Sequence, residues 1–267
     1  MQLRGFAVMF LMWATPLVSV RAQTIIPKQE LILPIVVNGQ LDSNRFFQST
    51  MHFLTTDSPG EVSRRGRDNN GGPLNVACLL AASSAAGDFT GVPGIPLFWS
   101  FRICPVLFNP PLESGWIQFT VLNSPPARID LELLLQERSA AGNRIVSATS
   151  IPAVAPAKEF LAPVISTTDN RSAYAIVNPS ESETATLTLK LETIGPNTKG
   201  LVCQRALSIP PHTRISKFLD ELVTNCQLPE DFRVGTLRIT SDIPIAVGAL
   251  NVFFPEGQFV NLPVEAQ

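Results

Sequence analysis

Hydrophobic and polar residues alternate along several short stretches of this chain. Residues 186–192 read TLTLKLE, which places Leu187, Leu189 and Leu191 on one face of an extended segment and polar residues on the other. Side chains alternate between the two faces of a strand, so this pattern predicts a β-strand with one buried side. The same alternation recurs at 117–121, 129–135, 237–239 and 245–247.

Turn-forming residues separate these stretches at short intervals, at 178–179, 195–197, 210–211 and 241–244. Short amphipathic strands joined by such turns predict antiparallel β-sandwiches and not βαβ units. One segment, 216–223, predicts a short helix, because Phe218, Leu219 and Leu222 share a helical face and Ser216 can cap it. We therefore expect an all-β protein with at most a short helix.

The two halves of the chain repeat each other in order. Residues 33–36 resemble 162–165, residues 49–54 resemble 172–177, and residues 115–120 resemble 235–240, at displacements between 120 and 129 positions. This order predicts two tandem antiparallel β-sandwich modules, residues 23–150 and 158–267. The prolines of 151–157 (IPAVAPA) predict an extended connector between them.

The first 22 residues have the pattern of a secretory signal peptide. Arg4 precedes an apolar run of 15 residues at 6–20, and Val20 and Ala22 suit a signal-peptidase site before Gln23. The run is shorter than the roughly 20 residues that cross a bilayer as a helix. We expect cleavage, no transmembrane segment afterwards, and a destination in the periplasm, on the cell surface or in the medium.

Four cysteines remain after this cleavage. In an exported protein an even number favours disulfide bonds over free thiols or zinc ligands, although three complete pairings are possible. Cys203 follows Cys78 by 125 positions, and Cys226 follows Cys104 by 122 positions, which is the displacement of the repeat. Equivalent positions would form equivalent bonds, so we predict one disulfide in each module, Cys78–Cys104 and Cys203–Cys226.

Composition narrows the range of possible binding partners. Removing Arg4 and Arg21 leaves 18 basic and 22 acidic residues, so the net charge is −4. An acidic balance gives no reason to expect nucleic acid or an anionic membrane as partner. An extracellular protein or a polysaccharide remains possible. Hydrophobic residues make up 45% of the chain, enough to form substantial cores.

No catalytic motif stands out. There is no GxSxG motif, and the two histidines, His52 and His212, fall in a strand pattern and in a turn. The neighbouring acidic pairs at 181/183, 220/221 and 230/231 lie at turns or on the predicted helix, where solvated charge is expected. We expect no enzyme activity, no cofactor and no metal site.

Residues 57–73 are predicted to form a polar loop where the second half has its clearest strand. They include the chain's basic cluster, Arg64, Arg65 and Arg67, which we interpret as a solvated loop or, alternatively, as a contact for an acidic ligand. The DNNG sequence at 68–71 lacks the alternating oxygen ligands of a calcium loop and predicts a turn.

Two tryptophans follow the signal segment, Trp99 and Trp116. Exposed aromatic rings form stacking platforms in sugar-binding modules, so both are candidates for a ligand platform. Trp116 lies within a strand pattern and Trp99 lies beside Phe98 and near Phe101, which favours packing in a core or at a module interface.

Residues 160–264 carry further motifs in a fixed order: NPS at 178–180, FLDEL at 218–222, LPEDF at 228–232, GTLRITSDIPIAV at 235–247 and LPV at 262–264. This order resembles repeated modules of secreted bacterial proteins whose function is mostly unassigned. The resemblance implies an Ig-like β-sandwich at a bacterial surface and brings no catalytic residues.

The sequence thus predicts a non-catalytic exported protein with a structural, adhesion or surface-assembly role. Two alternatives remain open. A carbohydrate-binding module would require Trp99 or Trp116 to be exposed in a shallow groove. An unrecognised hydrolase would require a pocket that brings a histidine or two carboxylates together.

Overall fold

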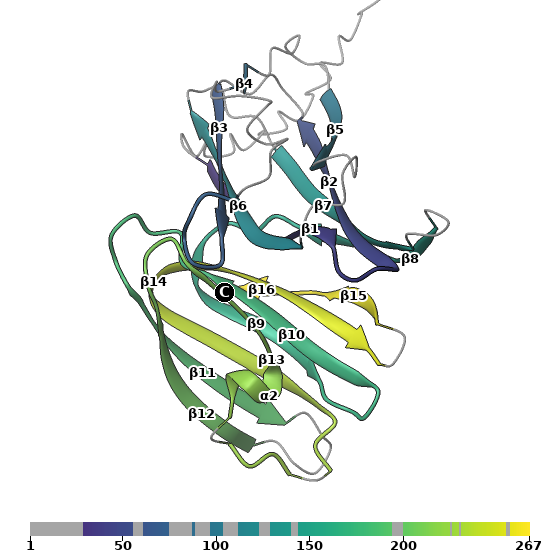
Figure 1. The fold of residues 1–267 in the computed structure, drawn as a ribbon. Helices are drawn as coiled ribbons and strands as arrows, with labels where there is room; N and C mark the ends of the chain where they lie inside the picture. The colour runs from purple at the N-terminus through teal and green to yellow at the C-terminus, as the bar shows by residue number, and fades with distance from the viewer. Residues whose placement is uncertain are drawn as a thin grey trace, which may run out of the picture.

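The computed structural model describes residues 29–55, 61–74, 87–88, 97–103, 112–122, 129–139, 144–193, 200–224, 226–229, 231–254 and 257–267. The predicted signal peptide, Cys78 and Cys104 lie outside these ranges. The described chain is almost entirely antiparallel β-structure, with one short helix, α2 (Leu219–Leu222), so the all-β prediction is confirmed (Figure 1). Within these ranges no helix has the length and apolar composition to cross a membrane.

One sheet contains only strands from the first half of the chain: β1 (Gln29–Gln40), β2 (Arg45–Thr55), β3 (Glu61–Asp68), β4 (Gly87–Asp88), β5 (Leu97–Ile103), β6 (Glu113–Leu122), β7 (Ile129–Ser139) and β8 (Ile145–Pro152). Strand β1 connects its two ladders. It pairs with β6 over most of its length, and its end pairs with β2 at Gly39 and Gln40. The ladders are therefore β4-β3-β6-β1 and β5-β2-β7-β8.

A second sheet contains only strands from the second half: β9 (Ala157–Ile165), β10 (Asn170–Val177), β11 (Ala185–Thr193), β12 (Gly200–Ile209), β13 (Arg214–Phe218), β14 (Val234–Phe253), β15 (Gln258–Leu262) and β16 (Glu265–Ala266). Strand β14 is 20 residues long and connects two ladders. Its first part pairs with β11 and β9, and its last part pairs with β10 and β15.

The strand pairing of the second sheet repeats that of the first. In the first half β6 lies between β3 and β1, and in the second half the first part of β14 lies between β11 and β9 in the same way. The order β5-β2-β7-β8 likewise corresponds to the order β13-β10-β14-β15, to which β14 contributes its last part. The register is also shared: Leu33 lies opposite Ile117, and Ala162 lies opposite Leu237. These residues belong to the segments that resemble each other in sequence.

Two local features recur at equivalent positions. The Ser49 hydroxyl bonds both the main-chain N–H and the carbonyl of Val37, and the Ser172 hydroxyl bonds the same two groups of Ile165. Gly115 and Gly235 form the second feature. At each of them a side chain would clash with a carbonyl oxygen of the neighbouring strand, that of Arg67 or Glu192 respectively.

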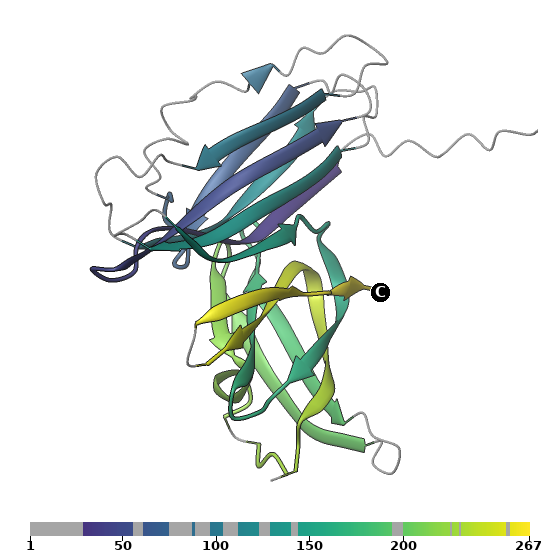
Figure 2. The same cartoon turned by 90° about the vertical axis from the view of Figure 1, so that its right-hand side faces the viewer.

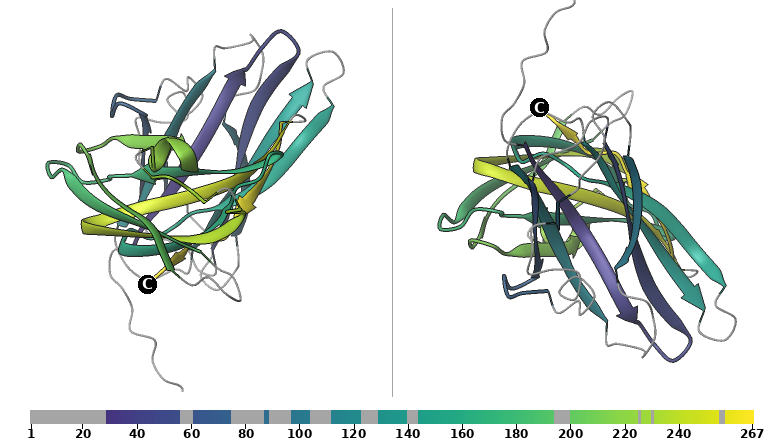
Figure 3. Two further views of the ribbon diagram at one scale, coloured as in Figure 1. Left: turned by 90° about the horizontal axis from the view of Figure 1, so that it is seen from below. Right: turned by 90° about the horizontal axis from the view of Figure 1, so that it is seen from above.

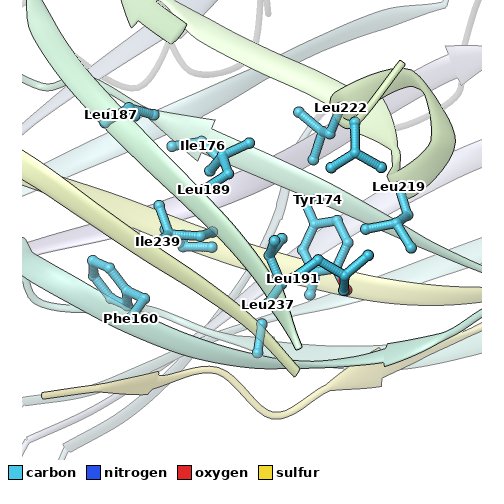
Figure 4. Close-up of a cluster of buried hydrophobic side chains, with 14 of the residues drawn as sticks. Phe160, Tyr174, Ile176, Leu187, Leu189, Leu191, Leu219, Leu222, Leu237 and Ile239 are labelled. Carbon is cyan, nitrogen blue, oxygen red and sulfur yellow. The ribbon is translucent and has the colours of Figure 1, made fainter. Parts of the chain in front are cut away.

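The predicted alternation matches the buried faces of the strands. Leu187, Leu189 and Leu191 are at most 1% exposed, and they pack with residues of both second-half ladders (Figure 4). In the first half, Leu131, Leu133 and Leu135 are buried in the same manner and pack with β1 and β6. Each core therefore lies between two ladders, an arrangement that fits a β-sandwich.

The Cys203–Cys226 disulfide is present, as predicted. It joins β12 to the segment that follows α2, and the two cysteines are 23 positions apart. The helix itself is shorter than predicted and begins after Phe218, not at Ser216, because Ser216 still pairs with Ala175 in the ladder. The predicted partner bond, Cys78–Cys104, lies outside the described residues.

The prediction that 57–73 forms a polar loop is wrong for 61–68, which form strand β3. This strand pairs with β6 from Glu61 to Asp68, as β11 pairs with β14. Arg64 occupies the ladder position that Leu189 occupies in the second half, and burial lowers its pKa. The strand forms because its main-chain groups bond to β6 whatever the side chains are. Its polar sequence lacks the hydrophobic alternation from which a strand is predicted.

The residues between the two sheets are extended and partly buried. Ile151 is 1% exposed and belongs to β8, while Val154 exchanges two main-chain hydrogen bonds of 2.8 Å with Ile32 of β1. The connector therefore packs against β1.

The two sheets lie one above the other (Figure 2), and their strands cross when the molecule is viewed end-on (Figure 3).

Candidate functional site

Four fully buried side chains hold the two halves together. Ile32 of β1 and Trp116 of β6 pack against Val177 of β10 and Ala246 of β14, and each is 0% exposed. Val154 of the connector packs against the same cluster. We call the contact between the two halves around this cluster the junction.

Arg214 forms the polar centre of the junction. It is the first residue of β13, is 5% exposed, and lies opposite Val177 in the ladder. Its Nη1 donates to the carbonyls of Pro34 (3.0 Å) and Gly115, both in the first half. Burial lowers the pKa of this guanidinium to about 10, so it remains protonated at neutral pH.

Asn69 completes this arrangement from a turn of the first half. Its side-chain carbonyl accepts from Arg214 Nε at 2.9 Å, and its main-chain carbonyl accepts from the Arg214 N–H at 3.1 Å. The turn is held by Asp68, whose Oδ1 accepts from the N–H groups of Asn70 and Gly72 at 2.8 Å each. The predicted turn at 68–71 is therefore confirmed, and it presents Asn69 to Arg214.

A polar cleft opens beside the junction. Glu181 lies at its edge and accepts from Arg65 Nη1 at 2.5 Å and from His212 Nε2 at 3.1 Å. The cleft has a volume of about 460 Å³, and its other polar lining residues are Glu30, Gln118, Thr120, Ser180 and Glu183. Arg65 of the predicted basic cluster is thus engaged by a carboxylate of the second half.

The candidate platform tryptophans have different positions. Trp116 is fully buried, and no acceptor lies within hydrogen-bond distance of its Nε1 among the described residues. It therefore presents no face to solvent and serves the junction. Trp99 lies opposite Phe53 in the β2–β5 ladder, but its side chain lies outside what the structure describes.

The acidic pair at 220 and 221, considered for catalysis, has structural partners, and Glu230 lies outside the described residues. Asp220 forms an ion pair with Arg171 at 2.5 Å, and Glu221 accepts from the Phe218 N–H at 2.9 Å to cap α2. The described ranges contain no group of three or more His, Cys, Asp or Glu side chains placed to hold a metal ion. Cys203 and Cys226 are bonded to each other.

Arg214 and Asn69 were not identified from the sequence. Each lies in an ordinary polar stretch near a turn, and 145 positions separate them. The importance of Arg214 comes from acceptors in distant segments, and no local pattern encodes them. Comparisons with models of protein families, with curated proteins and with solved structures found no match to this chain.

Proposed function

We propose that this chain is a non-catalytic exported protein, made of two duplicated Ig-like β-sandwich modules, with a structural, adhesion or surface-assembly role. The junction is the observation that carries the proposal. A connector without further contacts would let two modules move independently, which is the default for domains with small interfaces. Here the buried cluster and the hydrogen bonds of Arg214 to Asn69, Pro34 and Gly115, which we call the clamp, favour a stiff two-module unit.

The repeated pairing order supports duplication. The shared register, the equivalent serines and the equivalent glycines are features that two unrelated sandwiches would have no reason to share. A duplicated β-sandwich with a stiff junction suits a protein that spaces or joins other components. Fold alone does not establish such a role, so it must be tested directly.

The carbohydrate-binding alternative loses one of its two candidate residues, because the Trp116 ring is buried. For the hydrolase alternative, the polar cleft does bring carboxylates together: Glu30, Glu181 and Glu183 line it, and His212 Nε2 lies 3.1 Å from Glu181. Glu181 is also bonded by Arg65, while Asp220 and Glu221 serve an ion pair and a helix cap. The hydrolysis test below therefore addresses this cleft.

The decisive experiment deletes the gene in the producing organism and measures adherence and surface assembly. Complementation with the wild-type gene should restore both. A double variant, Arg214→Met with Asn69→Ala, removes the clamp and should restore neither, even where the exported amount is normal. Gln204→Ala on exposed β12 is the matched control and should behave as wild type.

Two results would contradict the proposal. One is a deletion strain with unchanged adherence and surface assembly. The other is a purified protein that hydrolyses a substrate. Binding to a glycan array, abolished by Trp99→Ala, would instead support the carbohydrate-binding alternative.

A further inference from the structure

An apolar groove lies at the junction, on the side of the β10–β13 pair that faces the first half. Its volume is about 510 Å³, within the range of roughly 300–1,000 Å³ usual for small-molecule sites. Residues of β10, β13, α2 and β14 line it from the second half, and residues of β1 and the start of β6 line it from the first half. The apolar lining residues include Ile35, Val37, Leu112, Ala173, Ala175 and Leu250.

Arg214 lines this groove, and not all of its N–H groups donate to the acceptors of the clamp. A guanidinium has five N–H hydrogens, one on Nε and two on each terminal nitrogen. The Nε hydrogen goes to Asn69, and the two on Nη1 go to Pro34 and Gly115. Among the described residues no acceptor bonds to Nη2, and Nη2 is not one of the fully enclosed atoms without a partner, so its two hydrogens are available to solvent or to a ligand.

The charge at this position also lacks a counter-ion. The three partners of the guanidinium are amide or peptide oxygens, and no carboxylate among the described residues pairs with it. Burying a cation without a counter-charge is costly, and a bound anion would offset that cost. The groove thus combines an apolar surface with an uncompensated positive charge.

We propose that this groove binds an aliphatic carboxylate, such as a medium-chain fatty acid. The carboxylate accepts from Arg214 Nη2, and the hydrocarbon chain packs against the apolar walls. The assignment goes beyond the structural role proposed above and does not depend on it.

The chemistry of the groove excludes the other simple ligand classes. A cationic amphiphile would be repelled by the guanidinium, and a neutral one could accept from Nη2 only through a weaker, uncharged hydrogen bond. A phosphate group offers more charge and more acceptors than one nitrogen can satisfy. Lys217 and Glu221, which also line the groove, carry opposite charges, so together they add no net charge to it.

Titration calorimetry with three probes tests the assignment on the full exported chain. Decanoate should bind once per chain. Decanol, which keeps the hydrocarbon but lacks the charge, should bind at least about tenfold more weakly, since charge-assisted hydrogen bonds are the stronger kind. Acetate, which keeps the carboxylate but lacks the chain, should give no measurable heat.

Variants test whether the ligand binds in the groove. Ala173→Leu fills the groove and leaves Arg214 intact, so decanoate binding should be lost. Ala206→Leu makes the same change on exposed β12, away from the groove, and should bind as wild type. Arg214→Lys keeps a positive charge and should retain part of the affinity, whereas Arg214→Met should bind decanoate no better than decanol.

A second readout does not use the Arg214 variants, whose stability should fall, and so keeps the test independent of their folding. With decanoate labelled with ¹³C at its carboxyl carbon, binding should shift the carboxyl resonance in the wild type and in Ala206→Leu but not in Ala173→Leu. Equal binding of decanoate and decanol, or undiminished binding to Ala173→Leu, would overturn the proposal. The stiff-unit role would stand in either case, because it rests on the clamp and not on Nη2.

Discussion

Arg214 and Asn69 bond to each other twice, through main chain at 3.1 Å and through side chains at 2.9 Å, although 145 positions separate them. One residue begins a strand of the second half, and the other lies in a turn of the first half. The pair therefore adds a non-covalent contact to the covalent connection between the two sheets. It also positions the guanidinium beside the apolar groove.

Replacing Arg214 tests the clamp by its effect on stability. Arg214→Met keeps much of the side-chain volume but leaves the Pro34 and Gly115 carbonyls without their donor, so the free energy of unfolding should fall by about 3 kcal/mol. Urea denaturation measures it. Lys217→Met, at an exposed position of the same strand, should change it by less than about 0.5 kcal/mol. Equal values for the two variants would exclude the clamp.

The equivalent serines allow a test of the repeat. Ser49 and Ser172 are each 0% exposed and each bond one N–H and one carbonyl of a neighbouring strand. Each change to alanine should therefore cost about 1–2 kcal/mol. The two losses should add within about 0.5 kcal/mol in the double variant, because the sites share no partner. A loss at one site alone would argue against equivalent roles.

The disulfide of the second half should stabilise it measurably. Changing both Cys203 and Cys226 to alanine should lower the free energy of unfolding by about 3.5 kcal/mol on the chain-entropy model for a loop of this length. Denaturation under oxidising conditions measures the difference. A reductant should destabilise the wild type toward the variant, and an unchanged midpoint would contradict the expectation.

The pairing of the other two cysteines remains a prediction. Peptide mapping without reductant should recover Cys78 linked to Cys104. If the two halves are copies, each cysteine pair should occupy equivalent positions, so the Cys203–Cys226 bond predicts a bond between Cys78 and Cys104. A link from Cys78 or Cys104 to Cys203 or Cys226 would contradict both the pairing and the repeat.

Glu137 should make stability depend on pH. It is 1% exposed and bonds Arg45 at 3.2 Å, but burial outweighs this partner and raises its pKa. A raised pKa means that the folded state binds the proton more tightly than the unfolded state does. The free energy of unfolding therefore falls as the pH rises from the ordinary pKa of 4.5 through the raised value. Glu137→Gln should therefore gain stability over the wild type between pH 4 and pH 7. A constant difference across that range would contradict the expectation.

The sequence alone determined the features that depend on neighbouring residues. Alternation at 186–192 identified β11 and its buried face, because an extended chain points successive side chains to opposite sides. The DNNG sequence identified the turn, because Asp68 bonds the main chain just after it. Comparison of the halves selected the Cys203–Cys226 pair.

Tertiary structure alone decided the features that depend on distant partners. Strand β3 has a polar sequence and forms because β6 supplies its hydrogen bonds. Trp116 is buried because residues of the second half cover it. Arg214 became the centre of the junction because three acceptors from separate segments of the first half meet at its guanidinium. Local patterning records which face of a strand is buried, but what covers that face is set only when the chain has folded.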